Sequence, residues 1–207
     1  MISTEALAPV DGQSVFLNVP FDSEYGPLFL ALISGLTALG LTPRCVLEVP
    51  SGRRNRLERI FSLLESCSAS VHDLSRITLS SHQKVPRFNM PFELGMAYAL
   101  ARKVSHDFFV LEEKPFRLQT SLSDLNGHDP HIHASNPSGV LRCILDCFGT
   151  PAATPSLPTL EALTRQLERA SSKLQKEMKV DGLFHPFLFR RLVTAAAEMA
   201  RNRNLIR

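Results

Sequence analysis

Three acidic side chains stand where the chain pattern changes from buried to exposed. Asp22 follows the run SVFLNVPF, Asp73 lies in ASVHDLS, and Glu93 is the only charge in the apolar helical pattern NMPFELGMAYAL. A carboxylate held on a rigid, partly dry element can act as a nucleophile or stabilise a cationic sugar. The residue types therefore predict chemistry at a sugar carbon, with Glu93 as the principal group.

A purely structural role for Glu93 is the alternative. An acid in the first turn of a helix complements the helix dipole by roughly 0.3 to 1 kcal/mol. Pro91 is expected to start the helix, and Gly95 to let a ligand approach the backbone closely. These neighbours favour the functional role.

Strand-like and helical patterns alternate up to residue 113 and would position these acids. The predicted strands cover residues 14–21, 41–49, 69–75 and 106–113. The predicted helices between them cover residues 22–40, 51–67 and 90–103. This order predicts an α/β fold in which a parallel sheet carries helices on both faces. Ligands bind beyond the carboxyl ends of such strands, where NVPFDSEY, HDLS and FNMPFELG would meet.

These same segments carry a resemblance to a known family. The run from VFLNVPFDSEYGPLFL to GLTPR, then VHDLS and NMPFELGMAYAL, resembles nucleoside 2-deoxyribosyltransferases and their TIR-like relatives, many of them in bacterial defence systems. The likeness covers residues 14–113, and ELGMAYAL is its most specific part. It implies a flavodoxin-like (Rossmannoid) sheet and no cofactor or metal.

The resemblance also implies roles for individual residues. Glu93 would be catalytic at the anomeric carbon of a nucleoside, a nucleotide or NAD. Asp73 would bind sugar hydroxyls or help to protonate the leaving base. The base and sugar pocket would be lined by Asn18, Pro20, Phe21, Asp22, Tyr25 and Asn89.

Basic residues near the predicted site indicate a phosphate on the ligand. The loop between Asp73 and Glu93 is longer than the family pattern and carries Arg76, Lys84 and Arg87. A second group, SGRRNR, follows the second strand and offers Arg53 and Arg56. Both groups favour a nucleotide over a nucleoside, with solvated surface cations as the alternative.

Other classes of function are disfavoured. The net charge of +3 is too small for a nucleic-acid-binding face. The four cysteines form no CxxC pair, so we expect reduced thiols, and a cytoplasmic protein without a membrane span or signal peptide. The segment NGHDPHIH, with His128, His131 and His133, lacks the spacing of a metal site, and we expect ordinary turn roles there.

The C-terminal part of the chain has a different sequence pattern from the rest. We predict a domain over residues 1–150 and a C-terminal helical extension over 151–207, whose helices at 160–179 and 185–204 are amphipathic. Mixed charges on them favour packing on the domain or on a second copy, so a homodimer is allowed.

Three functions stay open from the sequence. The first is an enzyme that cleaves or transfers an N-glycosidic bond. The second is a module that senses a nucleotide without turning it over, and the third is a TIR-like assembly domain.

Overall fold

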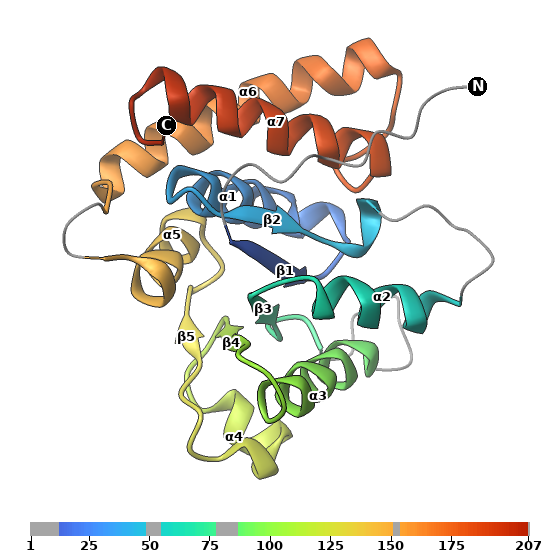
Figure 1. Cartoon of the computed structure of the whole chain (residues 1–207). Helices are drawn as coiled ribbons and strands as arrows, with labels where there is room; N and C mark the ends of the chain where they lie inside the picture. The colour runs from blue at the N-terminus through green and yellow to red at the C-terminus, as the bar shows by residue number, and fades with distance from the viewer. Residues whose placement is uncertain (1–12, 49–54, 78–86, 151–153, 207) are drawn as a thin grey trace.

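The computed structural model describes four stretches of the chain, residues 13–48, 55–77, 87–150 and 154–206. A five-stranded sheet in the order β2-β1-β3-β4-β5 forms its centre, and all neighbouring strands are parallel (Figure 1). The strands are β1 (Ser14–Asn18), β2 (Thr42–Arg44), β3 (Ala69–Asp73), β4 (Asp107–Glu112) and β5 (His131–Ile132). This is the predicted flavodoxin-like α/β fold.

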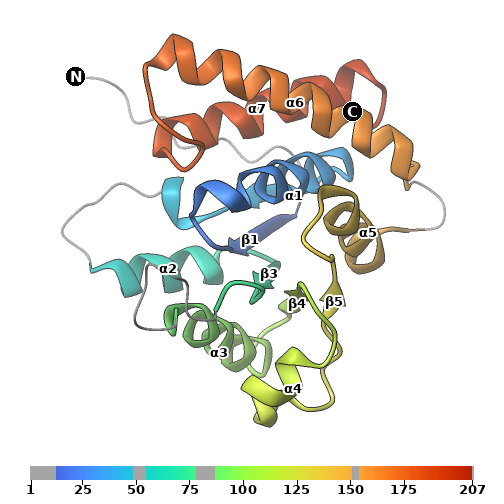
Figure 2. The same cartoon turned by 180° about the vertical axis from the view of Figure 1, so that it is seen from behind.

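Helices cover both faces of the sheet, with α1 and α5 on one face and α2 and α3 on the other (Figures 1 and 2). The α-helices are α1 (Gly26–Ala38), α2 (Arg56–Glu65), α3 (Asn89–Ala101), α4 (Arg117–Ser121), α5 (Pro137–Phe148), α6 (Leu157–Met178) and α7 (Pro186–Asn202). Three short 3-10 helices lie in connections: η1 (Ser23–Tyr25), η2 (Val46–Glu48) and η3 (Ser123–Leu125).

The helix α1 is apolar all round because it lies between two layers. Every residue from Leu28 to Ala38 is buried. The sheet covers one side of the helix, and α6 and α7 cover another, where Leu163 and Leu192 join the same core (Figure 1). The C-terminal helices thus form an outer layer on α1. The division of the chain after residue 150 stays a prediction.

Two elements differ from the sequence-based expectation. The second strand ends at Arg44, because residues 46–48 turn into η2. The helix α3 begins at Asn89, so Glu93 lies in its second turn and not in the first. Pro91 is tolerated as the third helical residue because the first N–H groups of a helix have no partner within it. Residues 117–132 form the short elements α4, η3 and β5, of which α4 and β5 were not predicted.

Side-chain alternation along the strands separates two environments. Leu17 and Val71 face the core under α1, whereas Phe16 faces the smaller core under α2 and α3. Because side chains on a strand alternate between the two faces, Asn18 and His72 share the α2 and α3 face. Asp73, the next residue on β3, must point to the opposite face.

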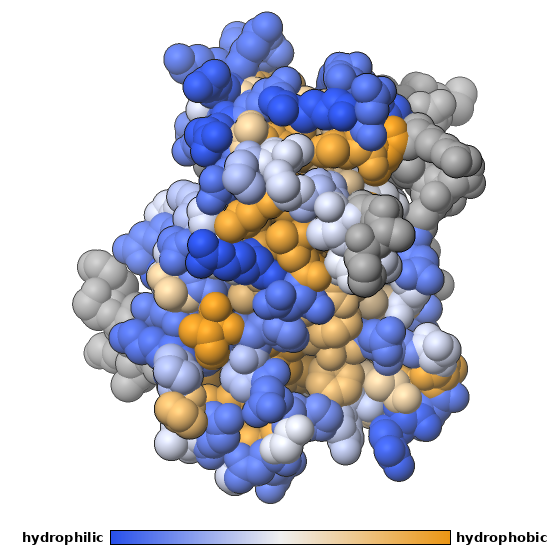
Figure 3. Space-filling view, turned by 90° about the vertical axis from the view of Figure 1, so that its left-hand side faces the viewer, coloured by the Kyte–Doolittle hydropathy of each residue, from blue (hydrophilic) through white to orange (hydrophobic). Residues whose placement is uncertain are grey.

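The surface mixes hydrophilic and hydrophobic side chains on the face seen in Figure 3. In the described part of the chain, no helix combines the length and apolar character needed to cross a bilayer. Phe88 and Phe92 are exposed on the outer side of α3. The predicted homodimer and the cytoplasmic location remain predictions.

Candidate functional site

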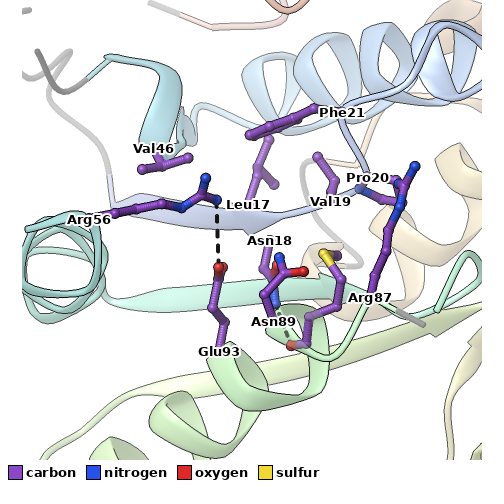
Figure 4. A pocket seen from close by; sticks show the side chains of 11 residues that line it. Leu17, Asn18, Val19, Pro20, Phe21, Val46, Arg56, Arg87, Asn89 and Glu93 are labelled. Carbon is purple, nitrogen blue, oxygen red and sulfur yellow. Dashed lines mark hydrogen bonds and ion pairs between the residues drawn. The ribbon is translucent and has the colours of Figure 1, made fainter. Parts of the chain in front are cut away.

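A cavity of about 290 Å³ opens at the carboxyl end of β1, between the first turns of α2 and α3. In a sheet of this kind, the strand order reverses between β1 and β3, and ligands bind beyond the carboxyl ends of the strands at that point. The volume is at the lower end of the range for small-molecule sites. Its lining consists of Leu17, Asn18, Val19, Pro20, Phe21, Val46, Arg56, Arg87, Asn89, Met90 and Glu93 (Figure 4).

Glu93 is the acidic side chain of this lining. It is 5% exposed and lies on the inner face of α3, one turn after Asn89. A guanidinium nitrogen of Arg56 stands 3.9 Å from its carboxylate, and Figure 4 shows the two side chains facing each other. Burial raises the pKa of Glu93 from 4.5 to about 7, although the Arg56 charge and a hydrogen bond from Asn89 lower it. The carboxyl group therefore exchanges its proton near neutral pH, as acid–base and nucleophilic groups in active sites do.

The remaining α3 neighbours have other roles. Phe92 is exposed, and Gly95 faces open space, since a Cβ added there would meet no described atom within 4 Å. Gly95 is also not among the residues that line the cavity, so it does not let a ligand approach the backbone there. The glycine lies on the side of the helix away from the cavity.

Two arginines stand on opposite sides of the cavity (Figure 4). Arg56 is the first residue of α2, whose N-terminus is capped by the side chain of Asn55. Arg87 precedes α3 and donates to the Asp22 carboxylate at 2.9 Å. The cavity thus has the exposed Arg56 guanidinium at one end and the Asp22-paired Arg87 at the other, with the Glu93 carboxyl group partly protonated near pH 7.

Asp22 supports the cavity from outside its lining. It accepts a hydrogen bond from the Tyr25 backbone N–H and forms ion pairs with Arg76 and Arg87. Arg76 also pairs with Glu24, so its charge is matched by two acids. Arg53 and Lys84 lie outside the described residues.

Asp73 and Tyr25 lie together on the other face of the sheet. The Tyr25 hydroxyl donates to Asp73 at 2.5 Å, the Ser75 N–H donates at 2.9 Å, and Nε2 of His133 lies 3.2 Å away. Burial alone raises the pKa of Asp73, but these neighbours together hold it below its usual value. Asp73 is fully buried and is not part of the cavity lining. Asp73 thus joins β3 to Tyr25 of η1 and to His133, which lies between β5 and α5.

The three histidines of NGHDPHIH point to different surroundings. His128 contacts the rings of Tyr98 and Phe108, and His131 contacts Phe109. His133 is buried beside Asp73. Within the described ranges, no group of three or more His, Cys, Asp or Glu side chains is arranged to hold a metal ion.

The structure thus gathers seven of the predicted residues in one cavity: Asn18, Pro20, Phe21, Arg56, Arg87, Asn89 and Glu93. Sequence reasoning missed the buried polar residues beneath it. Asn18 bonds to the backbone of α3 through Met90, and to His72 on β3. The available signal was the alternation of Ser70 and His72 in ASVHD, which places two polar groups on one face of a buried strand.

None of the protein-family models, curated proteins and solved structures compared with the chain matches it.

Proposed function

We propose that the cavity binds a nucleotide or a closely related molecule, and that Glu93 acts on its N-glycosidic bond by cleavage or transfer. The observation that supports this most is the surroundings of Glu93. Its carboxyl group is nearly buried, lies in a cavity at the carboxyl ends of the strands and has a pKa of about 7.

Glu93 would act in its ionised form. As the bond between the sugar carbon and the base nitrogen breaks, its electron pair leaves with the base and positive charge develops on the sugar. A carboxylate fixed beside that carbon stabilises the charge or bonds to the carbon. Water, or a second base in a transfer, then attacks the carbon, and Glu93 can accept the proton that water gives up.

The position of Asp73 changes the role that the family resemblance implies for it. A carboxylate held ionised on the opposite face cannot protonate a base in the cavity. Among the described lining side chains, Glu93 is the one that exchanges protons near neutral pH. This favours a leaving base that departs without added protonation, as nicotinamide does from a pyridinium nucleotide.

Arg56 at one end of the cavity supports a ligand with a phosphate. Arg56 is 57% exposed and can turn toward an anion while Glu93 remains in place. A planar guanidinium binds phosphate through two hydrogen bonds. A nucleoside has no phosphate to pair with this guanidinium.

Release of free base from candidate substrates tests the proposal. Purified protein would be incubated with NAD, nicotinamide mononucleotide, nucleoside 5′-monophosphates and nucleosides, and the products separated by chromatography. Glu93→Gln should lower the rate at least about a hundredfold, as expected for loss of an acid–base or nucleophilic group. Glu177→Gln is the matched control, because Glu177 is 56% exposed on α6.

Three outcomes would contradict the proposal. Undiminished base release by Glu93→Gln would remove the carboxylate from the chemistry. Tight binding of a nucleotide that stays intact under all conditions would favour the sensing module. Assembly without any ligand would favour the TIR-like assembly domain.

A further inference from the structure

A chain of hydrogen bonds runs beneath the cavity through four buried side chains. The Asn18 amide nitrogen lies 3.0 Å from Nδ1 of His72, a cross-strand neighbour on β3. Nε2 of His72 lies 2.9 Å from the Ser70 hydroxyl, which lies 2.9 Å from Nε2 of His106. Nδ1 of His106 lies 3.0 Å from the carbonyl oxygen of Cys67. This series of hydrogen bonds therefore connects the cavity wall to the opposite end of β3.

The direction of these hydrogen bonds follows from the cavity end. The Asn18 amide also contacts the Met90 carbonyl oxygen at 2.9 Å, and a carbonyl oxygen can only accept. The atom in contact must be the amide nitrogen, whose second hydrogen then points to Nδ1 of His72. This ring nitrogen must accept and is therefore bare. Burial, and the nearby His106, lower the pKa of His72 to about 3, so the ring is neutral with its hydrogen on Nε2.

The remaining directions follow from the far end of these hydrogen bonds. Nδ1 of His106 faces the Cys67 carbonyl oxygen, which can only accept, so Nδ1 carries the hydrogen and Nε2 of the neutral ring is bare. The Ser70 hydroxyl then donates to Nε2 of His106, while its oxygen accepts from Nε2 of His72. The two histidines are therefore opposite tautomers.

Asn18 consequently has a fixed orientation. Both amide hydrogens are used inside the protein, whereas its Oδ1 has no hydrogen-bond partner among the described residues. Oδ1 of Asn18 is not one of the fully buried polar atoms that lack a partner in the described residues, so it is accessible to a small molecule. Asn18 lines the cavity, which places this accessible atom there. The oxygen is therefore the polar atom that this amide offers to a ligand.

We propose that the cavity selects a ligand with a sugar hydroxyl, which donates to Oδ1 of Asn18, and that His72, Ser70 and His106 are positioning residues that fix this polarity. The proposal rests on the proposed function for the presence of a nucleotide in the cavity. Asn18 is bonded to Met90, three residues before Glu93 on α3. The Asn18 amide and Glu93 thus line the same cavity, and Asn18 is tied to the first turn of the helix that carries Glu93. The selected class is a nucleotide whose sugar carries a 2′ or 3′ hydroxyl, rather than one that lacks both.

The tautomers can be tested without a ligand. Long-range proton–nitrogen NMR correlations on protein with ¹⁵N-labelled histidine distinguish protonated from bare ring nitrogens. His72 should be protonated at Nε2 and His106 at Nδ1. Ser70→Ala, which removes the central link, should let His72 populate both tautomers. The opposite tautomer at either ring of the unmodified protein would overturn the proposal.

Ligand selection is tested by calorimetric titration with adenosine 5′-monophosphate and nicotinamide mononucleotide. Each is compared with its 2′-fluoro and 3′-fluoro analogues, because fluorine replaces the hydroxyl but cannot donate. One of the two replacements should weaken binding about tenfold, the usual value for one neutral hydrogen bond. Asn18→Ala should abolish this preference, whereas Asn89→Ala, which changes another amide of the cavity, should keep it.

Equal affinity for hydroxyl and fluoro ligands, or no affinity for either nucleotide, would overturn the proposal. Ser70→Ala protects the test against misfolding of Asn18→Ala, since it leaves the cavity lining intact and should also weaken the hydroxyl preference. Hydroxyl-selective binding without release of base would support this inference and refute the proposed N-glycosidic activity. The two failures are therefore distinguishable.

Discussion

Replacing Glu93 with Gln should stabilise the protein above neutral pH while it removes the proposed activity. The side chain is 5% exposed, and its ionised form has lost most of its hydration. Gln has nearly the same shape and never ionises. The variant therefore avoids the cost of a buried charge.

The size of the effect follows from the pKa. A change from 4.5 in an ordinary glutamate to about 7 in the folded protein is a rise of about 2.5. At about 1.4 kcal/mol for each pKa unit, the ionised carboxylate costs the folded state about 3 kcal/mol. For a chain of this length, that free energy corresponds to roughly 6 to 12 °C in the midpoint of thermal unfolding.

The stability difference between Glu93→Gln and the unmodified protein depends on pH between about 4.5 and 8. Below the unfolded pKa of 4.5, Glu93 is protonated in both states and costs nothing. As the pH rises from 4.5 to about 7, the unfolded chain loses its proton first, so the unmodified protein loses stability through this group. Above about pH 8 the loss is complete. The advantage of Glu93→Gln should grow over that window and then become constant.

Thermal and urea unfolding of both proteins between pH 4.5 and pH 9 measures this difference. Other titrating groups are common to both proteins and cancel. Glu177→Gln, at an exposed position, should show a small difference without this pH dependence. A constant difference between Glu93→Gln and the unmodified protein, or one that falls as the pH rises, would refute the assigned burial of the charge.

A pH–rate profile and three further variants test the site and the fold. If Glu93 acts as a carboxylate, base release should rise about tenfold per pH unit below pH 7 and level off above it; a rate that falls with pH would indicate an acid instead. Arg56→Gln should move that midpoint to higher pH, because the Arg56 charge lowers the pKa of Glu93; an unchanged pH–rate profile would contradict the contact. Tyr25→Phe should cost about 1 to 3 kcal/mol by removing a donor to buried Asp73, but should leave nucleotide affinity unchanged in titrations, and a loss of affinity would place Asp73 in the site. Leu163→Ala should cost about 2 to 5 kcal/mol in one cooperative unfolding transition, and a separate early transition would show that α6 and α7 unfold independently.

Much of the fold could be predicted from local patterns. Buried runs such as SVFLN and ASVHD, separated by helical patterns, are sufficient for a parallel sheet. Short or irregular elements were less accessible. The strand β5 has only two residues, and η2 replaces the end of a predicted strand, so neither carries a period long enough to read.

The candidate site could be predicted only in part. Glu93 stood out because it was the single charge in an apolar helix, and Asn18, Pro20 and Phe21 followed the first strand. Asp73 looked equivalent because it ends a neighbouring strand. Side-chain alternation instead sends His72 toward the cavity side and Asp73 to the face under α1.

The sequence by itself determined the alternation of strands and helices as far as β4, and with it the edge of the sheet where Glu93 would lie, because hydrophobic periodicity is a local property of the chain. Only the tertiary structure decided the ionisation of Glu93, the pairing of Asp22 with arginines, and the direction of the hydrogen bonds through His72 and Ser70. These depend on desolvation and on contacts between residues far apart in the chain, which become defined when the sheet and its helices close around them.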